Sequence, residues 1–84
     1  MNNIVSLNKI DTGKNCFVKE ILFNNKEKIR LYDLGIIENT SIRVLYRSPF
    51  NDQTAYLIRG TVLALRKDDS KKILVYEECS NGIN

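Results

Sequence analysis

Turn-forming residues recur at short intervals along this chain and divide its apolar residues into short segments. The clearest breaks are residues 11–15, the loop 48–53 and the charged stretch 67–72. Between the breaks lie five segments rich in β-branched, aromatic or alternating apolar residues, as is typical of strands: 16–23, 41–47, 54–59, 61–66 and 73–77. Short strands with frequent turns favour a small antiparallel β-barrel or sandwich.

One short segment after the first of these strands has helical character. Residues 26–34 are mostly good helix formers, and Asn24 or Asn25 can cap the helix by accepting a hydrogen bond from a free backbone N–H. Gly35 stands where a left-handed C-cap is expected. No parallel partner strand follows this helix, so the chain is expected to be mainly β, with about five strands and one inserted helix.

The helix has two apolar faces. Leu31 and Leu34 share one face, which is expected to pack on the barrel. Ile29 and Tyr32 share the other, which is open to the chain termini, to a partner or to a second copy.

Strict alternation in segment 41–47 predicts a half-buried strand. The predicted core face carries Ile42, Val44 and Tyr46. The predicted outer face carries Ser41, Arg43 and Arg47.

Length and charge bound the class of protein. A chain of 84 residues indicates a single domain over residues 1–84, with a core at about 7–77 and frayed ends at 1–6 and 78–84. Thirteen basic and ten acidic side chains give a mildly basic net charge of +3. No apolar run approaches the ~20 residues of a membrane-spanning helix and no signal peptide pattern begins the chain, so a cytoplasmic protein is expected.

The chain lacks the residues on which most catalytic sites depend. It has no histidine, and no Gly-rich phosphate-binding loop precedes a Lys-Ser or Lys-Thr pair. Cys16 and Cys79 have no histidine base and are too few for a zinc site, so they are expected to be ordinary thiols, although a bridge between them is geometrically possible. We therefore expect no enzymatic activity, no cofactor and no resident metal.

A nucleic-acid-binding barrel is a competing interpretation. Four arginines lie on or beside the predicted strands, and small barrels bind single strands by stacking bases on aromatic side chains in a basic groove. The predicted burial of Tyr46 and the mild net charge count against this interpretation.

An ordered set of short motifs resembles the FeoA family over residues 7–77. The motifs are the lead-in 7–13, the helix end Arg30-Leu31-Tyr32-Asp33-Leu34-Gly35, the strand 40–44, the Pro49 loop, Gly60 followed by Leu63-Ala64-Leu65-Arg66, and the last strand 73–75. Two places depart from the family pattern: Glu38-Asn39 stand where Pro-Gly is common, and Asn51-Asp52 stand where Gly-Asp is usual. Asn39 can adopt the left-handed conformation that this turn needs.

The resemblance implies an SH3-like barrel in a cytosolic accessory protein of ferrous iron uptake. Its partner would be FeoB, the membrane iron transporter with a cytosolic GTPase domain. The same fold occurs at the end of metal-dependent repressors, but this chain is too short to carry their DNA-binding segment. A general interaction barrel with another partner, or a small barrel for RNA or single strands, remains the alternative.

The matched positions divide into turns and candidate contacts. Gly13, Gly35, Asn39 and Gly60 are expected to serve the backbone conformation of turns. The candidate partner-binding residues are those expected to be exposed and of interface type: Arg30, Tyr32, Pro49, Phe50 and Arg66.

Overall fold

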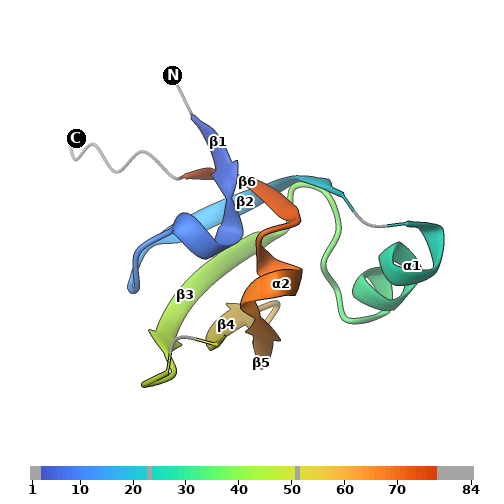
Figure 1. Cartoon of the computed structure of the whole chain (residues 1–84). Helices are drawn as coiled ribbons and strands as arrows, with labels where there is room; N and C mark the ends of the chain where they lie inside the picture. The colour runs from blue at the N-terminus through green and yellow to red at the C-terminus, as the bar shows by residue number, and fades with distance from the viewer. Residues whose placement is uncertain (1–2, 23, 51, 78–84) are drawn as a thin grey trace.

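The computed structural model describes residues 3–22, 24–50 and 52–77, which form one antiparallel sheet with short helices around it (Figure 1). In chain order the elements are β1 (Ile4–Ser6), the 3-10 helix η1 (Leu7–Lys9), β2 (Asn15–Ile21), α1 (Asn25–Asp33), β3 (Ser41–Arg47), β4 (Gln53–Ile58), β5 (Thr61–Arg66), α2 (Lys67–Ser70) and β6 (Ile73–Glu77). The strand order is β1-β6-β2-β3-β4-β5. The mainly β prediction, with a helix inserted after the first long strand, is confirmed.

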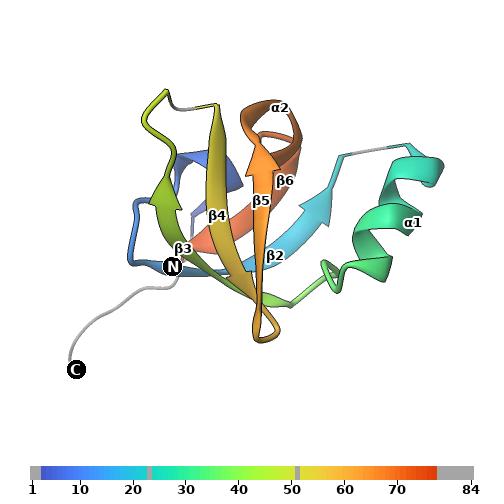
Figure 2. The ribbon, with the colours of Figure 1, turned by 90° about the horizontal axis from the view of Figure 1, so that it is seen from below.

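The sheet is curved but is not a closed barrel. In the described part of the chain, β1 and β5 are the two outer strands and do not pair with each other. The strands instead curl around one apolar core (Figure 2). Its fully buried side chains include Leu7, Ile10, Val18, Ile36, Ile42, Val44, Tyr56, Ile58, Ile73 and Val75. The predicted SH3-like antiparallel fold is confirmed, with the described sheet left open between β1 and β5.

The first strand was missed in the sequence. Residues 4–6 form β1 and pair with β6, so the predicted frayed start is wrong for them. Val5 packs against the core and the adjoining Leu7 is buried. A strand of three residues is too short to show alternation, which is why the pattern did not reveal it. Residues 78–84, with Cys79, lie outside the described residues, as do Phe23 and Asn51.

A β-bulge reverses the alternation of β3. Val44 pairs with Tyr56 but Tyr46 pairs with Ala55, so Leu45 is an extra residue on β3. Because side chains alternate with period two, one extra residue exchanges the faces of all that follow. Tyr46 is therefore 63% exposed rather than in the core, and Arg47 turns inward and is half-buried. Both predicted positions were wrong for this one reason.

Helix α1 begins and ends as its sequence signals indicate. The Asn24 side chain accepts a hydrogen bond from Glu27 N at 3.0 Å, which caps the first turn. At the other end Gly35 has φ +92°, with Ile36 N bonded to Leu31 O and Gly35 N to Tyr32 O, each at 2.9 Å. This is a Schellman motif, and its apolar contact is made by two buried side chains, Leu31 and Ile36.

The same motif explains why Leu34 is exposed. The chain reverses at Gly35, and Ile36 fills the core position that the sequence assigns to Leu34. Leu31 is the only side chain of α1 that belongs to the core among the helix residues whose side chains are described. In both views α1 stands beside the sheet rather than over one of its faces (Figures 1 and 2).

Among the described residues, five have a left-handed backbone conformation. Four of them were predicted to lie in such turns, namely Gly13, Gly35, Asn39 and Gly60, and the fifth is Arg59. Arg59 and Gly60 form the two-residue turn between Ile58 and Thr61, with φ +53° and +81°. Two successive positive φ values are typical of the type I′ hairpin. A β-carbon on Gly35 would lie 2.8 Å from Arg59 Cδ, so this turn contacts the end of α1.

Candidate functional site

The outer face of α1 presents apolar side chains to solvent. At 100° per residue, Ile29 lies about 160° around the helix from the buried Leu31, and Tyr32 lies about 60° from Ile29. Ile29 is 60% exposed and Tyr32 is 47% exposed. Leu22, before the helix, and Ile37, after it, are also exposed. We refer to Ile29 and Tyr32, the two exposed apolar side chains that share this face, as the α1 surface.

Arg30 does not share a face with Tyr32. The two are about 160° apart around the helix, although both are exposed. Arg30 lies instead about 40° from Leu34. A partner that contacts both candidates would therefore have to reach around α1.

The loop between β3 and β4 presents an exposed aromatic side chain. Phe50 is 89% exposed, the most of any large apolar residue in the described part of the chain. The base of the loop is held by Ser48, whose hydroxyl donates to Asp52 Oδ1 at 2.8 Å and whose backbone N–H donates to Gln53 O at 2.9 Å. Pro49 is exposed beside Phe50.

Arg66 belongs to the same end of the molecule as this loop. It ends β5 opposite Gln53, and the next residue, Lys67, donates its backbone N–H to Asp52 O at 3.0 Å. The structure therefore brings Pro49, Phe50 and Arg66 to one end of the sheet. Figure 2 shows that α1 lies on the far side from the β3–β4 loop.

The bulge in β3 creates a third surface that the sequence did not indicate. Tyr46 and Arg43 both lie exposed on the outer face of β3. Phe17, which pairs with Ser41 of β3 and with Tyr76 of β6, is exposed on the same face. Only the bulge shows that Tyr46 belongs here, and no local sequence signal marks an extra residue at Leu45.

Cys16 is not placed to act as a nucleophile or a metal ligand. Its side chain is fully buried, and Sγ donates to Ile42 O at 3.6 Å. Burial, with a smaller contribution from the negative charge of Glu77, raises the pKa of the Cys16 thiol to about 12. The thiol therefore stays protonated at neutral pH, in line with the ordinary buried thiol that was predicted.

The described ranges lack two features, a cluster of metal ligands and a membrane-spanning helix. No group of three or more His, Cys, Asp or Glu side chains gathers there as a metal site would require. No helix there is both long and apolar enough to cross a membrane.

Comparison with known proteins places the chain in a family. The family model described as the FeoA domain matches residues 5–77. No curated protein matches the sequence significantly.

Solved structures share the fold over nearly the whole chain. A FeoA-like protein from Clostridium acetobutylicum is 28% identical, with a TM-score of 0.85, over 100% of this chain and 98% of that one. The FeoA protein of Chlorobium tepidum is 22% identical, with a TM-score of 0.84, over 94% of this chain and 76% of that one. A manganese-dependent transcriptional repressor is 20% identical, with a TM-score of 0.80, over 93% of this chain and 43% of that one.

Proposed function

Because this chain belongs to the FeoA family, which is associated with ferrous iron transport, we propose that it docks on the membrane transporter FeoB as an accessory protein and modulates it. In this proposal residues 1–84 are a single domain that works in the cytoplasm without an enzymatic activity of its own. Iron chemistry would belong to the transporter.

The observation that carries the docking mode is the outward apolar face of α1. Ile29 points away from the core and Tyr32 is about half exposed, so both lose water only when another surface covers them. Fully burying a side chain of this size contributes about 1.5–3 kcal/mol. Two such side chains on one helix can therefore act as the centre of an interface.

The loop surface of Pro49, Phe50 and Arg66 is a second contact for the same partner. Aromatic and arginine side chains are enriched in interfaces. A Pro next to Phe50 restricts the loop backbone, so less conformational entropy is lost when the loop binds. α1 and this loop lie on opposite sides of the sheet (Figure 2). A transporter that contacts both must therefore extend along the sheet from one to the other.

The proposal is tested by titrating the protein against purified full-length FeoB in detergent, with GTP hydrolysis followed in parallel. Ile29→Ala with Tyr32→Ala should weaken binding by roughly tenfold or more, and Phe50→Ala by a smaller factor. Val62→Ala is the matched control, because Val62 is an exposed apolar side chain on the outer strand β5. It should bind like the unchanged protein.

Three outcomes would count against the proposal. Absence of binding in any nucleotide state would remove the partner. Equal losses for the α1 double variant and Val62→Ala would remove the α1 surface. Dimerisation of the free protein that the α1 double variant abolishes would assign this surface to a second copy instead.

The exposed position of Tyr46 favours one alternative function, the binding of single-stranded nucleic acid. Tyr46, Arg43 and Phe17 offer stacking and positive charge on one face of the sheet. Titration of mixed oligonucleotides tests this alternative, which requires a strongly salt-dependent affinity that Tyr46→Ala reduces. Tyr32→Ala serves as the matched control, because it removes an exposed tyrosine from another surface.

A further inference from the structure

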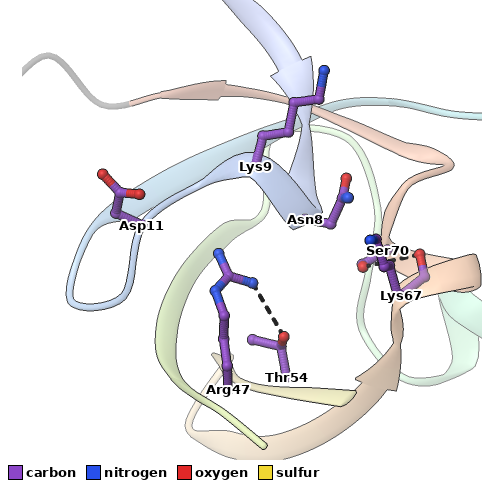
Figure 3. A pocket seen from close by; sticks show the side chains of 7 residues that line it. All are labelled: Asn8, Lys9, Asp11, Arg47, Thr54, Lys67 and Ser70. Carbon is purple, nitrogen blue, oxygen red and sulfur yellow. Dashed lines mark hydrogen bonds between the residues drawn. The ribbon is translucent and has the colours of Figure 1, made fainter. Parts of the chain in front are cut away.

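A polar pocket of about 420 Å³ opens between the start of the chain and α2. It is lined by Asn8, Lys9, Asp11, Arg47, Thr54, Lys67 and Ser70. Figure 3 shows Arg47 and Thr54 reaching into it from the sheet, Asn8 lying above them, and Ser70 forming the opposite wall. Lys9 and Asp11 point outward at the rim in the same view.

Arg47 is fixed in this pocket by two hydrogen bonds. Its Nη2 donates to Ile10 O at 2.6 Å and its Nη1 donates to Thr54 Oγ1 at 3.3 Å. The bulge at Leu45 is what turns this side chain inward. A guanidinium has five N–H donors in a rigid fork, so a pinned Arg47 keeps unused donors in a fixed geometry.

The positive charges of the pocket are not neutralised by neighbouring acids. Within the described ranges, Lys14 and Lys71 form ion pairs. No carboxylate of these ranges lies within 4.0 Å of the charged nitrogens of Lys9, Arg47 or Lys67. Asp11, the one acid of the lining, is largely exposed and faces Lys14 at 4.0 Å. Three cations therefore stand against one acid, and a half-buried Arg without a counter-charge is costly.

Two buried polar atoms without partners independently mark the same place. Among the described residues, Asn8 Oδ1 and Tyr56 OH are the buried side-chain atoms that make no hydrogen bond. Asn8 lines the pocket, and a half-turn of its amide would present a donor instead of an acceptor. Tyr56 adjoins the pocket, because its hydroxyl lies near Ser70, Thr54 and Arg47. Burial raises the pKa of Tyr56, and these three neighbours lower it by a smaller amount. The Tyr56 hydroxyl forms no well-aligned hydrogen bond with Ser70 or Thr54.

We propose that this pocket is an anion site that binds a phosphate group, held by the Arg47 fork. Thr54 holds the fork in place, because its Oγ1 accepts from Arg47 Nη1. Lys67 and Lys9 provide charge at the rim. The volume exceeds that of free phosphate, so a small phosphomonoester also fits. This site does not depend on the proposed docking to the transporter.

Nuclear magnetic resonance titration of the full chain tests the site. Inorganic phosphate and glycerol 3-phosphate are the two probes, each compared with chloride at the same ionic strength. Saturable shifts of the Thr54 and Ser70 amides and of the Arg47 Nε–H with either probe support the site. Tighter binding of one probe identifies free phosphate or a phosphomonoester as the source. Linear shifts that chloride reproduces would overturn the proposal.

Variants at the rim separate a site from general charge screening. Lys67→Gln should weaken phosphate binding by about two- to fivefold, and Asp11→Asn should strengthen it by a similar factor. Lys71→Gln is the matched control, because Lys71 is an exposed lysine next to α2 that pairs with Asp68 and does not line the pocket. Equal effects of Lys67→Gln and Lys71→Gln would contradict a localised site.

Arg47 itself is tested by the conservative Arg47→Lys, which keeps the charge but loses the fork. We expect a loss of about tenfold or more in phosphate affinity. The amide spectrum reports in the same experiment whether the fold is retained. A folded Arg47→Lys variant with unchanged affinity would overturn the role of the guanidinium.

Discussion

At the scale of single residues, Cys16 shows how burial decides chemical behaviour. β2 lies between β6 and β3 in the sheet, and the Cys16 thiol on it is closed to solvent and donates to Ile42 O. A charged thiolate would have to exist without water and near Glu77. The fold therefore holds the proton of this thiol far more tightly than an unfolded chain does.

This difference predicts a pH dependence of stability. The pKa of Cys16 rises from 9.0 to about 12 on folding, so the folded state retains the proton at pH values where the unfolded state loses it. The contribution of Cys16 is complete below pH 9 and is lost between pH 9 and about 12, at up to about 1.4 kcal/mol per pH unit. Urea denaturation at pH 8, 9 and 10 measures it.

Cys16→Ala is the control, because it removes the titrating group. Tyr56, whose pKa burial also raises, contributes with the same sign in both proteins and cancels in the difference. Parallel pH profiles for the two proteins would contradict the prediction.

Gly35 is required both for its backbone angle and for its lack of a side chain. With φ +92° and Arg59 Cδ at 2.8 Å from a built β-carbon, Gly35→Ala should lower the free energy of unfolding by more than the ~1–2 kcal/mol of a left-handed residue. Gly13→Ala is the matched control, since Gly13 has φ +85° and open space around it. Thermal denaturation compares the two variants, and equal losses would mean that Arg59 swings aside at no cost.

At the scale of elements, α1 is attached to the rest of the molecule at few points. Leu31 and Ile36 anchor its end, and Thr40 fastens the following loop by accepting from Ile37 N at 3.2 Å and donating to Gly35 O at 3.3 Å. The helix is thus well capped yet covered on one side only. This combination makes it suited to binding another surface.

The anchoring predicts unequal effects of two leucine variants. Leu31→Ala should lower the free energy of unfolding by about 2–4 kcal/mol, because it empties a buried position. Leu34→Ala should change it by less than about 1 kcal/mol, because Leu34 is exposed. Urea denaturation gives both values, and similar losses would show that Leu34 is packed in solution.

Local signals in the sequence predicted most elements but not the irregularities between them. The predicted bounds of β3, β5 and β6 and the caps of α1 agree with the structure, since alternation and capping are properties of neighbouring residues. The bulge at Leu45 is set by pairing with β4, which no window of β3 contains. For this reason Tyr46 and Arg47 were assigned to the wrong faces, and the pocket around Arg47 was not foreseen.

The candidate site was predictable only as single residues. The sequence indicated that Tyr32 and Phe50 are exposed, which the structure bears out. It did not indicate that α1 and the β3–β4 loop lie on opposite sides, because that depends on the curvature of the whole sheet (Figure 2).

At the scale of the whole molecule, the sheet formed by the described residues remains open and has two outer strands, β1 and β5. β1 covers one edge of β6 with only three residues. An uncovered strand edge is a template for pairing with another chain. The short β1 therefore protects the molecule as well as stabilising it.

A chain that begins at Leu7 after its initiating Met tests this role. It should lose roughly 1–3 kcal/mol of unfolding free energy, from lost hydrogen bonds to β6 and lost packing of Val5, and it should self-associate through β6. Thermal denaturation and sedimentation measure the two effects. Ile4→Ser is the control, because Ile4 is exposed and the strand is kept. An unchanged melting curve with monomeric behaviour would contradict the prediction.

The burial of Cys16 has one more consequence. Since its thiol cannot react in the closed fold, an alkylating reagent modifies it only during transient separation of the central strands, and the modification rate measures how often they separate. In a Cys79→Ser variant, the modification rate of the Cys16 thiol alone reports how often the central strands open. If a ligand bound at the α1 surface lowers this modification rate, the opening of the central strands is coupled to the helix.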